Sequence, residues 1–175
     1  MNFSRRQFPA FVLAVFSAVL LAGCGRQEPE STSAKTSAAP VAKAAVPPDI
    51  TVLAGDDMKF SVTRIEAAPG EAINLTLTNN GRMPKNAMGH NWVLLTKDAD
   101  ARAYCMAAMS AIGSDYLPPA QADKVLAHTS LLGPGESVTI NFNAPAEPGN
   151  YPFVCSFPGH FLSGMGGVLV VKAAP

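Results

Sequence analysis

The stretch VCSFPGHFLSGMGG, residues 154–167, decides how the rest of this sequence is interpreted. It places a thiol, an imidazole and a thioether close together, at Cys155, His160 and Met165. Pro158-Gly159 folds the chain between the first two, so that the three side chains can point at one spot. Such a soft donor set suits copper among the common metals. The alternative is a plain strand–turn–strand corner in which the three residues meet by chance.

The composition around this stretch favours a turn-rich β domain. The chain has 175 residues, of which 48% are apolar, and Gly and Pro are abundant. Eight short strand-like segments with turn signals between them predict an all-β sandwich or barrel. The expected strands are 49–55, 60–65, 72–80, 90–96, 124–132, 137–144, 150–157 and 166–174. The Ala- and Met-rich segment 97–113 predicts one helical excursion, with Gly113 as its stop.

The first residues have the pattern of an export signal. Arg5 and Arg6 precede a short apolar run that ends in Leu21-Ala22-Gly23-Cys24. This pattern predicts a bacterial lipoprotein signal peptide at 1–23 and lipidation of Cys24, the alternative being a plain signal peptide with a chance cysteine. Residues 24–47 then form a flexible tether of Ser, Ala, Pro, Lys and Glu, which leaves 48–175 as the folded domain.

The charge pattern and the remaining cysteines and histidines narrow the function. Basic and acidic residues balance at 13 each, so we expect no nucleic-acid binding. Cys105 and Cys155 could form one disulfide, which competes with the metal interpretation. A tight site needs a further ligand from elsewhere in the chain. His90, at the start of a strand, is the better candidate, whereas His128 lies inside an alternating strand and is expected to be structural or exposed.

Taken in order, MGHNWVL (88–94), DYLPP (115–119), VLAHTSLLGPGE (125–136) and FVCSFPGHF (153–161) strongly resemble azurin, a blue copper protein of the cupredoxin family. The resemblance spans 48–175 and implies a Greek-key β-sandwich. It also implies that His90, Cys155 and His160 are trigonal copper ligands and that Met165 is a long axial ligand. The Gly89 carbonyl would be a weak contact on the opposite side.

The resemblance also assigns two residues around the site. Asn91 matches the residue that ties the two ligand loops together. With the Phe157 backbone N–H, it would hydrogen-bond the Cys155 sulfur. Two departures from azurin matter: four residues separate His160 from Met165, a spacing that resembles auracyanins and plastocyanins, and the disulfide near the azurin N-terminus is missing. Cys105 is then a small buried apolar side chain.

The implied function is electron transfer by one type 1 copper that alternates between Cu(I) and Cu(II). We expect a monomer, and no enzyme. Redox proteins such as cytochromes, or a terminal reductase or oxidase, would dock transiently near His160, which we expect to reach the surface. The apolar surface around it would come from Met88, Phe157, Phe161 and Leu162. A copper carrier or resistance protein, a copper reductase, a cysteine hydrolase and a zinc site remain as alternatives.

The expected location follows from the N-terminal pattern. The protein would be exported and lipid-anchored to a bacterial membrane, facing the periplasm or the cell exterior. Gly25 after the lipidated cysteine carries no acidic retention signal, which favours the outer membrane.

Overall fold

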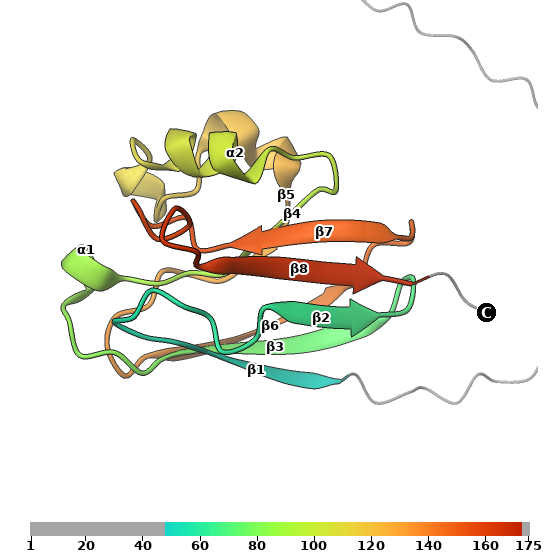
Figure 1. Cartoon of the computed structure of the whole chain (residues 1–175), viewed down its shortest axis with the longest axis horizontal. Helices are drawn as coiled ribbons and strands as arrows, with labels where there is room; N and C mark the ends of the chain where they lie inside the picture. Colours follow the sequence, from blue (N-terminus) through green and yellow to red (C-terminus); the bar gives the residue numbers. More distant parts are fainter. Residues whose placement is uncertain (1–47, 173–175) are drawn as a thin grey trace, which may run out of the picture. The chain divides into compact units, whose positions relative to one another are not determined.

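The computed structural model describes residues 48–172, and the predicted signal peptide, the predicted lipidation site Cys24 and the predicted tether lie outside this range. The described part consists mainly of β-strands with a few short helices, as predicted (Figure 1). Its elements are β1 (Asp49–Ala54), β2 (Arg64–Ala67), β3 (Ala72–Asn79), α1 (Lys85–Met88), β4 (Val93–Leu95), α2 (Ala101–Ala108), η1 (Ile112–Ser114), η2 (Pro119–Lys124), β5 (Val125–His128), β6 (Ser137–Asn143), β7 (Gly149–Val154) and β8 (Gly166–Val171). None of these helices is long and apolar enough to cross a lipid bilayer.

The strands form two sheets that enclose one main core. One sheet has the order β1-β3-β6 and the other β2-β8-β7-β4-β5. β1 pairs with β3 in parallel and β2 with β8 in parallel, and the other pairs are antiparallel. In β3, Ile73, Leu75 and Leu77 alternate inward with partly exposed Asn and Thr, as a half-buried strand requires. They meet residues of the second sheet such as Phe153 in the same core.

Helix α2 covers the outer face of the second sheet (Figure 1). All three residues of β4 are therefore buried, because Leu94 faces the main core while Val93 and Leu95 pack beneath α2. A strand covered on both faces loses the alternation of buried and exposed side chains. Tyr104 and Cys105 of α2 fill this smaller cluster.

The predicted helix 97–113 is wrong at both ends. The helix begins at Ala101 and not at 97, because the Asp100 side chain caps it by accepting from the Ala103 N–H at 3.0 Å. Gly113 does not stop α2, which ends at Ala108; it lies within the following 3₁₀ turn η1.

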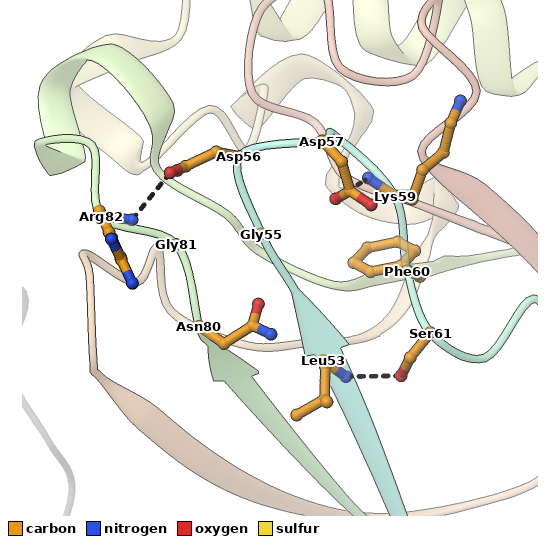
Figure 2. A pocket seen from close by; sticks show the side chains of 10 residues that line it. All are labelled: Leu53, Gly55, Asp56, Asp57, Lys59, Phe60, Ser61, Asn80, Gly81 and Arg82. Carbon is orange, nitrogen blue, oxygen red and sulfur yellow. Dashed lines mark hydrogen bonds between the residues drawn. The ribbon is translucent and has the colours of Figure 1, made fainter.

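The predicted strand 60–65 is in fact mostly a loop. β2 begins only at Arg64, and Phe60 forms an isolated bridge with Ala54. Ser61 folds back on β1, because its N–H donates to the Leu53 carbonyl while its Oγ accepts from the Leu53 N–H (Figure 2). The short helix α1 was not predicted.

Candidate metal centre

Strand β7 aims Cys155 into the molecule. Tyr151 and Phe153 face the main core, and Cys155 is the next residue of that alternation, directly after the strand ends. Its side chain is fully buried. The inward direction of the thiol therefore follows from the period of two along β7.

The loop after Cys155 is closed by its own backbone. The Cys155 N–H donates to the Met165 carbonyl at 3.1 Å, and the Met165 N–H donates to the His160 carbonyl at 3.0 Å. Gly159 and Gly164 have φ of 84° and 94°, which glycine adopts without steric cost. The folded loop places His160 Nδ1 3.4 Å from Cys155 Sγ. Met165, fully buried, is thus tied through its backbone to both residues.

His90 joins this pair from a distant part of the chain. It exchanges two backbone hydrogen bonds with Leu132, of 3.0 and 2.7 Å. Its Nδ1 lies 4.0 Å from Cys155 Sγ, and its ring centre lies 4.9 Å from that of His160. One donor atom each of His90, Cys155 and His160 lies within 4.8 Å of the others, and all three side chains are buried. No other such cluster occurs in residues 48–172.

Gly89 lies next to a residue of this cluster, whereas His128 lies outside the cluster. Gly89 is buried next to His90, and a Cβ there would lie 2.6 Å from the Lys85 carbonyl oxygen, so only glycine fits. His128 is exposed at the end of β5, where its Nδ1 lies 3.2 Å from the Thr129 carbonyl. As expected, His128 takes no part in the site.

Burial makes the three donors costly to charge. It raises the pKa of the Cys155 thiol to about 12, against the opposing effect of the backbone N–H groups of Asn91 and Phe157. Burial, together with the charge of His90, lowers the pKa of His160 to about 4. Two neutral imidazoles and a thiol in one dry spot are the donors that a metal cation binds after displacing the thiol proton.

The His90 ring is also affected by Asp56 and Gly55, which do not belong to the ligand cluster. Burial lowers its pKa, whereas Asp56 and the Gly55 carbonyl raise it. His90 Nε2 nevertheless has no hydrogen bond of normal geometry within residues 48–172. A ring held by a metal at Nδ1 would carry its proton at Nε2, on the side of the Gly55 carbonyl. The donor set and this second nitrogen both fit a bound copper ion.

Asn91 ties the two ligand segments together. Its Oδ1 accepts from the Ser156 N–H at 2.9 Å, and its Nδ2 donates to Ser156 Oγ at 2.9 Å and to the Asp115 carbonyl at 3.1 Å. Asn91 and Ser156 are buried, and the hydrogen bond to the Asp115 carbonyl is partly buried. The roles of Ser156, Asp115 and Gly55 could not be found from the sequence, because no spacing or residue type marks them as neighbours of the ligands.

The competing disulfide does not form. Cys105 and Cys155 are both free and buried. Cys105 lies on α2, against the outer face of the second sheet, whereas Cys155 faces the main core. A sheet therefore separates the two thiols, and Cys105 is a small buried side chain as expected.

The expectation that His160 reaches the surface is wrong for the side chain as a whole. It is only 2% exposed, because the rings of His90 and Phe157 cover it, the latter at 4.6 Å. Phe157 is itself buried and adds no apolar surface. Phe161 is half-buried, and only Leu162 of the expected group is well exposed, at 54%.

Comparisons with known proteins agree with this site. The family model of copper binding proteins, plastocyanin/azurin family, matches residues 49–172. Azurin of Pseudomonas chlororaphis is 41% identical over 121 residues, which cover 67% of this chain and 92% of that protein. Auracyanin-B of Chloroflexus aurantiacus is 35% identical over 119 residues, covering 67% of this chain and 49% of that protein.

Solved structures show the same relationship. The crystal structure of dithionite-reduced auracyanin from Roseiflexus castenholzii superposes with a TM-score of 0.62 at 32% identity, covering 73% of this chain and 97% of that one. These matches confirm the predicted cupredoxin sandwich, the single type 1 copper and electron transfer as the activity. The chain therefore belongs to the plastocyanin/azurin family of copper-binding proteins.

Proposed function

We propose that this protein carries single electrons between partner proteins on one copper ion held by His90, Cys155 and His160. Met165 would supply a further ligand, and the Gly89 carbonyl would make a weak contact. The observation that carries the proposal is the buried cluster of one Sγ and two imidazole nitrogens within 4.8 Å. When bound, the copper supplies a one-electron couple, because this ligand set suits both of its valence states.

The protein's part is to hold the ligands still. The loop from Cys155 to Met165 is closed by backbone hydrogen bonds, and His90 is paired with Leu132. Ligands fixed in this way change position little when the charge of the site changes, which lowers the cost of electron transfer. Two backbone N–H groups on the Cys155 sulfur stabilise its negative charge and so adjust the reduction potential.

The arrangement does not favour an enzyme. A copper reductase needs further histidines at an open position, but His128 is exposed and lies outside the cluster. A cysteine hydrolase would use the pair of Cys155 and His160, yet Cys155 is fully buried and out of a substrate's reach. We therefore assign the protein a carrier role without catalysis.

Partners would dock at the end of the sandwich that holds the ligand loop and α1 (Figure 1). His160 lies just beneath this surface, with the exposed Leu162 beside it in the sequence. A small apolar interface that buries less than roughly 1,200 Å² of surface suits a brief encounter with a cytochrome or a terminal reductase or oxidase. We expect the protein to act as a monomer.

One optical titration tests the proposal against its rivals. The copper-loaded protein should be intensely coloured, should lose the colour on one-electron reduction and should regain it on oxidation. Cys155→Ser should abolish the colour, and Cys105→Ala should keep it. A zinc protein or a Cu(I) carrier would stay colourless with Cu(II), which would overturn the proposal.

A second pair of variants tests the ligand from the distant segment. His90→Ala should open a coordination position that added imidazole fills, with a change in the visible spectrum. His128→Ala, the matched control, should leave the spectrum as it is. Equal spectra for the two variants would remove His90 from the ligand set.

We also propose an exported, lipid-anchored protein with a signal peptide at 1–23, a lipidated Cys24 and a tether to residue 47. The support is the sequence Leu21-Ala22-Gly23-Cys24 after an apolar run. The proposed place is the periplasmic or outer face of a bacterial membrane, with the outer membrane favoured. Cys24→Ala should release the protein from the membrane fraction, and continued membrane association would contradict the anchor.

A further inference from the structure

Two consecutive residues outside the ligand segments adopt a strained backbone next to the site. Asp115 and Tyr116, between η1 and η2, have φ of 52° and 62°. Met58 is the one other non-glycine residue with positive φ in the described range 48–172. Residues other than glycine avoid this region, so the contacts of the pair must hold it there.

The first contact of the pair orients Asn91. The Asp115 carbonyl accepts from Asn91 Nδ2 at 3.1 Å. A carbonyl oxygen only accepts, so it selects which end of the amide faces it. The other end, Oδ1, is thereby turned toward the N–H of Ser156, at 2.9 Å. A flipped amide would set two acceptors against each other at Asp115 and two donors at Ser156.

The second contact holds Phe157. The half-buried Tyr116 meets the Phe157 ring edge-on, with centres 4.9 Å apart at 63°. The Phe157 ring in turn lies against His160, at 4.6 Å. Tyr116 therefore restricts the residue that covers His160.

The contacts of Asp115 with Asn91 and of Tyr116 with Phe157 both lead to the Cys155 sulfur. Asn91 and Phe157 are the two residues whose backbone N–H groups favour the charged form of the Cys155 sulfur. The geometry points to a positioning role for the Asp115–Tyr116 turn: it fixes both N–H donors and so sets the strength of their hydrogen bonds to the sulfur. This inference rests on the proposed copper site. Weaker hydrogen bonds leave the sulfur more electron-rich, which stabilises Cu(II) and lowers the reduction potential.

The Asp115 arm of the test uses two neutral substitutions. Asp115→Asn tolerates the left-handed conformation, whereas the β-branched Asp115→Val does not. Both substitutions remove the carboxylate charge, so any difference in reduction potential between the two variants comes from the backbone conformation of the turn. We expect Asp115→Val to shift the Cu(II)/Cu(I) ratio toward Cu(II) by roughly threefold to tenfold relative to Asp115→Asn, the upper figure being about 59 mV. Equal potentials for the two variants would overturn the inference.

The Tyr116 arm compares Tyr116→Ala with Tyr116→Phe. The Phe variant keeps the ring that touches Phe157 and should keep the potential of the wild type. The Ala variant should lower the potential and shift the sulfur-to-copper absorption band. If Tyr116→Ala had the same absorption band and reduction potential as Tyr116→Phe, the inference would be overturned. If Asp115→Val does not fold, the Tyr116 pair decides.

Amide exchange measured by NMR gives a readout that does not depend on copper. In the copper-free full chain, the amide protons of Asn91 and Phe157 should exchange about tenfold faster in Asp115→Val and Tyr116→Ala than in the conservative variants. Unchanged exchange would refute the positioning role. A wild type that takes up no redox-active copper would instead refute the proposed function, and the exchange data would still decide the role of the turn.

Discussion

Asn91 and Ser156 bond to each other in both directions across 65 residues of sequence: the Ser156 N–H donates to Asn91 Oδ1, and Asn91 Nδ2 donates to Ser156 Oγ, each at 2.9 Å. Asn91 follows one histidine of the metal centre directly, and Ser156 follows the cysteine. The pair therefore fastens the two ligand segments at the point where they meet.

This pair predicts unequal effects for its two members. Ser156→Ala removes a hydroxyl but keeps the backbone N–H donor, so it should cost about 1 kcal/mol of unfolding free energy. Asn91→Leu leaves the buried Ser156 N–H without a partner, which should cost about 1–3 kcal/mol more. Urea unfolding of the copper-free protein measures both. Equal losses would show that the backbone bond contributes nothing.

Gly89→Ala should disturb the site through the backbone. The added Cβ would lie 2.6 Å from the Lys85 carbonyl oxygen and 3.0 Å from the Leu131 side chain, so the segment that carries His90 must move. We expect a loss of about 1–3 kcal/mol and an altered visible spectrum with copper. Gly113→Ala is the control, because its Cβ would meet no atom within 4 Å. A normal spectrum for Gly89→Ala would contradict the close fit.

Cys105 should be chemically inert in the folded protein. Burial raises the pKa of its thiol to about 12, so it stays protonated at neutral pH, and only the thiolate reacts readily. Iodoacetamide should therefore modify Cys105 in urea but not in buffer, as mass spectrometry of the copper-loaded protein can show. Rapid labelling of the folded protein would mean that α2 opens frequently.

Tyr104 should make the fold sensitive to alkali. Burial raises the pKa of its hydroxyl from 10.0 to about 12, and within residues 48–172 this hydroxyl has no hydrogen-bond partner. Between these pH values the unfolded chain releases the Tyr104 proton and the folded chain keeps it, so stability falls as pH rises. This decline should be on the order of 2 kcal/mol smaller in Tyr104→Phe. The stability of Tyr104→Phe still falls as pH rises, because burial also raises the pKa of the Cys105 thiol.

Tyr104→Phe should be no less stable than the wild type at pH 7, since it removes an unsatisfied buried hydroxyl. Urea unfolding at pH 7 and at alkaline pH gives both comparisons. A clear loss of stability at pH 7 would reveal a hydrogen bond at this hydroxyl.

Leu162→Lys should slow electron exchange with partners and leave the copper site intact. Leu162 is 54% exposed and lies two residues after the buried His160, so a charge there weakens an apolar encounter without touching a ligand. We expect a lower bimolecular rate in stopped-flow mixing with a cytochrome, at an unchanged reduction potential. The comparably exposed Leu126, as Leu126→Lys, is the control, and equal slowing of both would place docking elsewhere.

The donor types and the loop that carries three of them could be predicted from the sequence alone. The Pro-Gly turn predicted a loop in which Cys155, His160 and Met165 can point at one spot. Eight short strand-like segments separated by turn signals predicted an all-β sandwich or barrel, because strand patterns and turn residues are local properties of the chain.

The neighbours of these donors became known only from the folded structure. Asn91 meets Ser156 and Asp115, α2 covers the fully buried β4 and packs its own Cys105 against the sheet, and the rings of His90 and Phe157 bury His160. Each of these contacts joins residues whose separation along the chain follows no repeat. Such neighbours are selected by the packing of the whole fold, and local periodicity carries no information about them.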